Sequence, residues 1–149
     1  MNESRLPSLP CLCASFRRAA RALTQRYDAA IRPLGLRVTQ FTILQALSLT
    51  GEVSQGKLGE ILALDSTTLT RTLDHMRRAG WISRRRGEDR REWRLRLSAS
   101  GRNQLDRALP TWKEAQLHMA GRLGDKLWQD AFHLTGKVAD LAVASGDLS

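Results

Sequence analysis

Arginine is concentrated in one short stretch of the chain, residues 84–98, which reads RRRGEDRREWRLRLS and holds seven arginines. Like charges repel, and ordering long side chains costs conformational entropy, so this crowding requires an anionic partner. Guanidinium groups form paired hydrogen bonds with phosphate and with guanine. The stretch therefore predicts a polyanionic partner, with nucleic acid first and an anionic membrane surface second.

The net charge of the whole chain supports the same partner. Lys and Arg number 24 against 15 Asp and Glu, which gives a net charge of +9 and a pI near 10.9. Between Arg71 and Arg96 there are ten arginines against four acidic residues, a surplus of six in about a sixth of the length. A solvated charged face is the alternative, but a merely soluble basic protein would spread its charge more evenly.

Two cysteines near the start, Cys11 and Cys13, form the second group able to do chemistry. A bridge across one residue would be strained, so they predict no disulfide framework. Arg17, one helical turn after Cys13, and the positive N-terminus of a helix would both favour a reactive thiolate. Three roles stay open for the pair: apolar packing in a dimer helix, redox sensing, and capture of a metal or metalloid.

Catalysis has little support in the sequence. There is no glycine-rich phosphate loop, no cleft pattern of paired carboxylates and no nucleophile motif, so we expect neither an enzyme nor a cofactor. The three histidines, His75, His118 and His133, lack the spacing of metal ligands. A Cys-x-Cys pair supplies only two soft ligands per chain, so we expect no complete metal site.

Four longer helices are predicted from the spacing of apolar residues. The first is stopped by Pro33 and Gly35, the second is apolar on most sides and therefore buried, and the third should bend at Pro110. Their ranges are 11–32, 39–49, 100–123 and 125–144. The apolar faces of the first and last helices are too large for one small domain to cover, which predicts a homodimer.

Residues 53–81 read as two short helices with a tight break. Ser54 can cap the first, Asp65 or Ser66 can cap the second, and Gly80 ends it. The side chains expected to hold the two helices together are Leu58, Ile61, Leu69, Leu73 and Met76, and Leu62 is a further inner residue of the first helix. At 100° per residue, the opposite face of the second helix carries Thr67, Arg71, Asp74 and Arg78.

After Gly80 the apolar period changes from 3.6 to 2. Residues 81–86 and 92–98 alternate as strands, and residues 87–91 join them as a hairpin tip. Ser98 or Ser100 can cap the helix that follows. Helix, break, helix and hairpin is the order of a winged helix-turn-helix, so the predicted fold is mainly α with a small β wing.

This order predicts binding to the two grooves of duplex DNA. The second short helix would enter the major groove and read base edges with Ser66, Thr67, Thr68, Thr70, Arg71 and His75. The hairpin would follow the backbone and insert into the minor groove with Arg86, Asp89, Arg90 and Arg91. Within it, Asp89 is expected to hold the Arg91 guanidinium extended through a planar ion pair.

The chain resembles the MarR family of bacterial transcription regulators over nearly its whole length. The segments LGLRVTQFTILQAL and LGEILALDSTTLTRTLDHMRRAGWISRRRGEDRREWRLRLSASG carry the resemblance. The family's wing signature appears as Asp89 and Arg91 followed by LSASG, with Ser98 in place of a threonine. The resemblance implies DNA-binding residues 36–100, dimerisation residues 1–34 and 101–149, and a pseudo-palindromic operator of double-stranded DNA. It also implies an effector cleft between the dimer helices and the winged region.

The branch of the family that senses organic hydroperoxides offers a further match. Cys13 lies at the spacing of that branch's reactive cysteine, and Tyr27 matches a tyrosine used near the thiol. Arg17 and Val38 stand where two further tyrosines are expected, so the thiolate pocket is incomplete. The resemblance implies a repressor released by cysteine oxidation or by a small phenolic or hydroperoxide effector. The alternatives are a non-specific nucleic-acid-binding or structural protein and a metal or metalloid sensor using Cys11 and Cys13.

No apolar run is long enough for a signal peptide or for a membrane span of about 18 residues. The expected location is the cytoplasm, with no membrane partner. Two-fold symmetry would then set two reading helices about one DNA turn apart, ~34 Å.

Overall fold

The computed structural model describes residues 6–144, and the chain divides into two compact units between Trp112 and Lys113. The fold is mainly helical with a small β wing, as the sequence predicted, and the wing belongs to a three-stranded antiparallel sheet. In chain order the elements are α1 (Leu12–Ile31), η1 (Arg32–Leu34), α2 (Val38–Thr50), β1 (Val53–Ser54), α3 (Gln55–Leu62), α4 (Ser66–Arg78), β2 (Ile82–Arg86), β3 (Trp93–Leu97), α5 (Ala99–Leu123) and α6 (Asp125–Ala144).

The core of the first unit is built around α2. This helix is apolar on nearly every side, which is why the sequence predicted its burial, and Phe41, Ile43, Leu44 and Leu47 are all buried. Its N-terminus is fixed by α1, because the Val38 N–H donates to Asp28 Oδ1 at 2.6 Å. The buried side chains of α2 form one apolar cluster with those of α3, α4 and the sheet.

The α3–α4 pair is capped at both N-termini as predicted. Ser54 Oγ accepts the Lys57 N–H at 3.1 Å, and Asp65 Oδ2 accepts the Thr68 N–H at 2.9 Å. The turn between the helices passes through Ala63 in the left-handed region, with φ of 50°. A side chain rarely adopts that conformation, so the surrounding packing must hold the turn.

Four of the five residues expected to hold α3 and α4 together lie inward. Leu58, Leu69, Leu73 and Met76 are buried, and Leu62 packs against them in part. The prediction was wrong for Ile61, which is 47% exposed. With only eight residues in α3, Leu58 and Leu62 fill the side that faces α4, and Ile61 points away from it.

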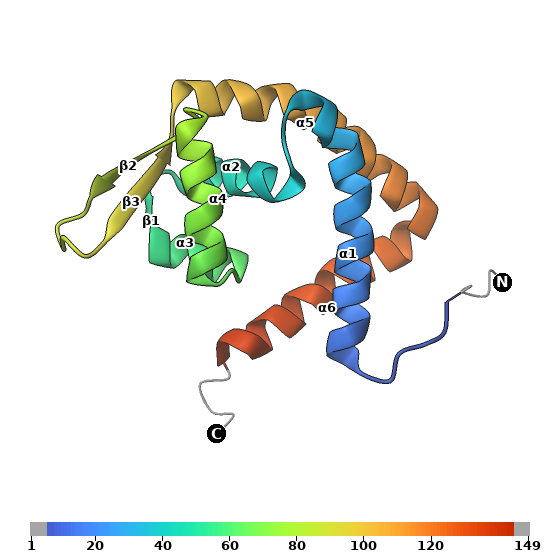
Figure 1. The fold of residues 1–149 in the computed structure, drawn as a ribbon. Helices are drawn as coiled ribbons and strands as arrows, with labels where there is room; N and C mark the ends of the chain where they lie inside the picture. Colours follow the sequence, from blue (N-terminus) through green and yellow to red (C-terminus); the bar gives the residue numbers. More distant parts are fainter. Residues whose placement is uncertain (1–5, 145–149) are drawn as a thin grey trace. The chain divides into compact units, whose positions relative to one another are not determined.

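The sheet has the strand order β1-β3-β2. The β2–β3 pairing brings Ile82 opposite Leu97 and Arg86 opposite Trp93, and the hairpin extends beyond the helices of its unit (Figure 1). The two-residue strand β1 was not predicted, because two residues are too few to show an alternating pattern. By pairing with Leu95 and Arg94, it joins the hairpin to the segment that follows α2.

A close backbone approach connects the hairpin to α5. Ser98 caps α5 by accepting the Gly101 N–H at 3.0 Å, and its own hydroxyl donates to the Gly80 carbonyl. A Cβ atom on Gly101 would lie 1.9 Å from the Trp81 carbonyl oxygen, so no other residue fits there. Gly80 itself has φ of 80° and ends α4 in the left-handed region that favours glycine. The helix α5 continues through Pro110.

The second unit contains the end of α5 and the whole of α6. Large apolar side chains remain exposed along α6, namely Leu127, Phe132, Leu134 and Leu141. Trp128 packs edge-on against Phe132 with ring centroids 5.1 Å apart. None of the helices within residues 6–144 is long and apolar enough to cross a bilayer.

Candidate DNA-binding surface

The outer face of α4 is a continuous polar surface. The side chains predicted to read DNA from this helix are all exposed, namely Ser66, Thr67, Thr68, Thr70, Arg71 and His75, while Leu69, Leu73 and Met76 lie beneath them. Hydrogen bonds from Thr68 lower the pKa of Asp65 below its ordinary value, so the cap stays ionised and holds the first turn of α4. Arg71 makes no side-chain hydrogen bond or ion pair within residues 6–144.

One residue that the sequence did not single out orients this face. Gln55, at the start of α3, donates from Nε2 to the Thr70 hydroxyl at 3.1 Å. A hydroxyl that accepts one hydrogen bond still has its own proton to donate. The Thr70 hydroxyl can therefore donate its proton to an acceptor atom on the edge of a base. A helix-capping Ser54 followed by a polar residue was the only signal for Gln55 in the sequence.

The wing (residues 82–97) is supported on one face by a carboxylate from outside it. Glu52, just before β1, accepts paired hydrogen bonds from Arg85 and a further one from Arg94 Nε at 3.1 Å. The Glu52 side chain is 26% exposed. The hydrogen bond from Arg85 is the main reason that the pKa of Glu52 is lowered, and the bond to Glu52 likewise raises the pKa of Arg94.

The other face of the wing is an arginine–tryptophan stack. The guanidinium carbons of Arg84 and Arg86 lie 3.9 and 3.6 Å from the centroid of the Trp93 ring. Cations over an indole ring are attracted by its quadrupole. Arg86 also donates from Nη1 to the Arg90 carbonyl at 2.9 Å, so it contacts both the ring and the hairpin tip.

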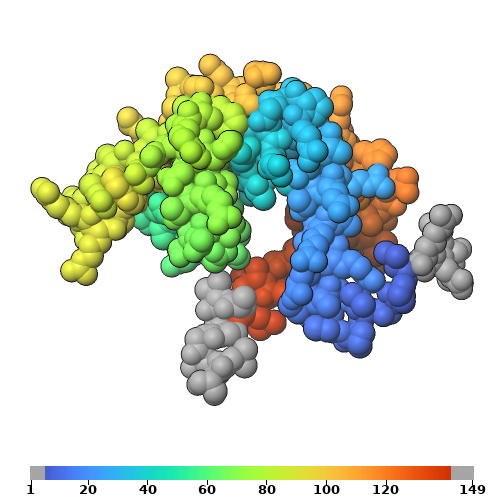
Figure 2. Space-filling model, in the orientation of Figure 1, coloured from blue at the N-terminus to red at the C-terminus, as the bar shows by residue number. Residues whose placement is uncertain are grey.

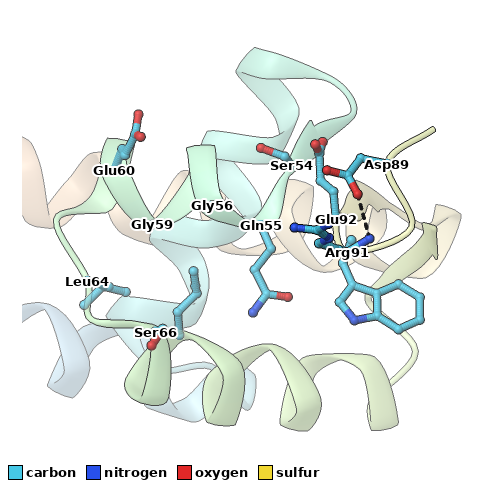
Figure 3. Close-up of a pocket in the computed structure, with 12 residues that line it drawn as sticks. Ser54, Gln55, Gly56, Gly59, Glu60, Leu64, Ser66, Asp89, Arg91 and Glu92 are labelled. Carbon is cyan, nitrogen blue, oxygen red and sulfur yellow. Dashed lines mark hydrogen bonds between the residues drawn. The ribbon is translucent and has the colours of Figure 1, made fainter. Parts of the chain in front are cut away.

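The ion pair predicted between Asp89 and Arg91 at the hairpin tip was wrong, and Asp89 has a different role there. Its Oδ1 accepts the backbone N–H of Arg91 at 3.0 Å, and no ion pair joins the two side chains (Figure 3). Backbone hydrogen bonds from Gly87 to Glu92 and from Glu92 to Asp89 close the same turn. Asp89 is two residues from Arg91 in a tight turn, so its carboxylate reaches the near backbone N–H before the distant guanidinium. Asp89 therefore shapes the loop.

Between the wing and the helices lies a groove with a volume of about 650 Å³. It is lined by α3, by the N-terminus of α4 and by the wing, and Figure 3 shows Gln55 and Ser66 on one side and Arg91 and Glu92 on the other. In Figure 2 the hairpin, coloured yellow, projects beside the green α4. Three of the predicted contact residues, Ser66 of α4 and Asp89 and Arg91 of the wing, therefore border one groove.

Cys11 and Cys13 lie at the N-terminus of α1, far along the sequence from the residues that line the groove. Cys11 and Cys13 are both exposed as free thiols, and Arg17 donates from Nη2 to Cys13 Sγ at 3.3 Å. Tyr27 is 14 residues further along the same helix than Cys13, about 21 Å at ~1.5 Å per residue. Within one chain, Tyr27 therefore does not contact the Cys13 thiol. Burial raises the pKa of Tyr27. Among residues 6–144, no group of three or more His, Cys, Asp or Glu side chains could hold a metal ion.

Comparisons with known proteins agree with this geometry. The family model described as MarR family matches residues 36–93, which cover α2 to the start of β3. The crystal structure of the transcriptional regulator MosR from M. tuberculosis in complex with DNA is 38% identical, with a TM-score of 0.81, over 91% of this chain and 98% of that one. The chain belongs to the MarR family.

Two curated relatives from Bacillus subtilis match a shorter part of this MarR-family chain. The uncharacterized HTH-type regulator YwoH is 31% identical over 81 residues, and the organic hydroperoxide resistance transcriptional regulator is 33% identical over 91 residues. The matches cover 54% and 60% of this chain but only 59% and 62% of those proteins, less than two thirds of either. MarR from E. coli on operator DNA, at 19% identity and a TM-score of 0.76, shares the fold.

Family membership also decides the broad class of the protein. MarR-family proteins are DNA-binding regulators of transcription and are not enzymes, so the expectation drawn from the missing catalytic motifs is confirmed.

Proposed function

We propose that the chain regulates transcription by binding duplex DNA with α4 in the major groove and the wing tip in the minor groove. The observation that carries the proposal is the exposed polar face of α4 beside a wing ending in Arg90 and Arg91, in a chain 38% identical to a regulator solved on DNA. Arg71 would pair with guanine, and the tip arginines would enter the narrow groove where the potential is most negative.

The protein would act as a homodimer on a pseudo-palindromic site. The exposed apolar residues of α6 and those at the start of α1 support this arrangement, because exposed leucines and phenylalanines on one helix favour a second copy. Two copies related by a two-fold axis recognise two half-sites, and occupation of such an operator would repress the adjacent gene.

The oligomeric state is tested by light scattering after size exclusion. Leu134→Glu, in the apolar face of α6, should shift the mass from dimer to monomer. The matched control is Leu49→Glu on α2, where the side chain is already 83% exposed and a charge should leave the dimer intact. A wild-type protein that elutes as a monomer would refute the dimer.

DNA binding is tested by selecting duplexes from a random library with the full chain and then footprinting the selected sequence. We expect protection of one short palindrome and an affinity at least about 10³-fold above that for unrelated DNA. Uniform protection of every sequence would instead identify a non-specific nucleic-acid-binding protein.

Oxidation of Cys13 is proposed to release the DNA. Its thiolate would attack an organic hydroperoxide, breaking the O–O bond to give a sulfenic acid and an alcohol, with one proton taken up. The contact at 3.3 Å places the Arg17 guanidinium beside the Cys13 sulfur, and one curated relative is a regulator of organic hydroperoxide resistance. A polar group at the start of α1 would then disturb the dimer helices.

Cumene hydroperoxide separates this route from release by a bound ligand. It should free the selected duplex from wild type and not from Cys13→Ser, while Cys11→Ser reports whether the neighbouring thiol takes part. Equal release from wild type and Cys13→Ser would refute the Cys13 route and leave a small phenolic effector as the candidate.

A further inference from the structure

The wing contains two arginines that should repel each other. In the β2–β3 register, Arg85 and Arg94 are direct cross-strand partners. Like charges placed opposite each other destabilise a strand pair, and a two-stranded hairpin is only marginally stable by itself. The wing therefore needs a compensating group on the face that carries these two side chains.

Glu52 supplies that group from outside the wing. Its two carboxylate oxygens pair with Nε and Nη2 of Arg85, and Oε1 also accepts from Arg94 Nε at 3.1 Å. Arg94 further donates to the Glu52 carbonyl at 3.3 Å and to Glu92 Oε1 at 3.0 Å. These bonds span 33 and 42 residues of sequence, so they tie the wing to the segment that follows α2.

We infer that Glu52 is a positioning residue for DNA recognition, and that Arg85 and Arg94 hold the wing to it in place of contacting phosphates. The inference rests on the proposed function, since it concerns how the wing is presented to a duplex. A carboxylate repels phosphate groups, so attraction to DNA does not explain an acidic residue on this surface. A positioning role does explain it.

The remaining wing arginines fit this division of roles. On the opposite face, Arg84 and Arg86 lie over Trp93, and Arg86 also holds the Arg90 carbonyl. The guanidinium groups of Arg90 and Arg91 make no hydrogen bond or ion pair within residues 6–144. The tip arginines are therefore the pair left for phosphates. Of the other five, Arg84, Arg85, Arg86 and Arg94 keep the tip in place, and Arg96 donates from Nε to the Ser83 hydroxyl at 3.3 Å within the sheet.

Neutralising Glu52 distinguishes positioning from simple attraction by the sign of its effect. Glu52→Gln raises the net charge of the protein by one, so long-range attraction predicts tighter DNA binding. If Glu52 positions the wing, its loss should weaken DNA binding. Arg85 and Arg94 would then repel each other, and the hairpin would no longer be bonded to the segment after α2. The control is Glu60→Gln, which neutralises an exposed carboxylate of the same winged region that pairs with Lys57.

Binding of the full-length protein to its selected duplex is measured by fluorescence anisotropy at several KCl concentrations. We expect Glu52→Gln to weaken binding about 5- to 30-fold and Glu60→Gln to leave it unchanged or tighter. Arg85→Ala should weaken binding without changing the salt slope, whereas loss of a phosphate contact lowers that slope by about one. Tighter binding by Glu52→Gln, or a lower slope for Arg85→Ala, would overturn the inference.

Amide hydrogen exchange on the free protein gives a readout that needs no DNA. In Glu52→Gln, exchange should become faster in residues 82–97 and stay unchanged in α4, and unchanged exchange in the wing would overturn the inference. If wild type selects no sequence, the proposed function fails, but the exchange measurement still decides whether Glu52 orders the wing.

Discussion

Helix α4 and the wing both border the proposed DNA-binding surface but are held by different forces. Beneath α4 lie Leu69, Leu73 and Met76, each at most 3% exposed. Within the wing only Ile82 and Leu95 are buried, and besides its strand pairing the wing is held by ion pairs and an arginine–tryptophan stack. Apolar burial is not screened by salt, whereas partly exposed ion pairs are. The position of α4 should therefore be insensitive to salt, whereas the stability of the wing should depend on salt and on the charges that hold it.

The largest expected effect comes from the core beneath α4. Met76→Ala should lower the free energy of unfolding by about 2–5 kcal/mol, because Met76 is fully buried and its truncation leaves a cavity. Urea denaturation monitored by circular dichroism measures the change. Leu49→Ala, at a position 83% exposed, is the control and should change stability by less than about 0.5 kcal/mol. Equal effects of the two variants would contradict the packing described for α4.

A second pair of variants compares the two regions on DNA. Arg71→Ala on α4 should cost about 1–3 kcal/mol on the selected duplex and relax the preference for one base pair. Arg90→Ala at the wing tip should weaken all sequences alike and lower the salt slope by about one. Competition binding with single-base variants of the duplex separates the two patterns. Base-specific loss for Arg90→Ala would show that the wing also reads sequence.

A smaller effect is expected at the contact between α3 and α4. Gln55→Ala frees the Thr70 hydroxyl, which should change the affinity for the selected duplex by about 0.5–1.5 kcal/mol, the usual contribution of one hydrogen bond. The double variant with Thr70→Val should show no additional loss if Gln55 acts through Thr70. Additive losses in that cycle would instead give Gln55 an independent contact.

The smallest effect concerns pH. Hydrogen bonds from Arg85 lower the pKa of Glu52 in the folded protein, so its stabilisation is present above the unfolded value of about 4.3 and is lost as pH falls through the lower folded value. The difference in thermal stability between wild type and Glu52→Gln should stay constant from pH 7 to pH 5 and shrink below about pH 4. A difference that disappears already near pH 6 would contradict the pairing.

Much of the fold, and the outward-facing residues of α4, could be predicted from local patterns in the sequence. The apolar spacing of α2, the caps Ser54 and Asp65 and the alternation after Gly80 each act within a few residues, so the sequence predicted them. The same periodicity predicted which side chains of α4 lie outward. For Ile61 it failed, because an eight-residue helix offers two apolar faces and only its partner helix decides which is buried.

What the sequence determined by itself is that this chain has a helix pair followed by an arginine-rich hairpin, since capping, period and charge are local properties of neighbouring residues. Only the tertiary structure decided what each arginine does. The hydrogen bonds that Arg85 and Arg94 donate to Glu52, the stack on Trp93 and the turn at Asp89 depend on which strands meet and in which register. Guanidinium groups look identical in a sequence, and their partners distinguish them only after the chain has folded.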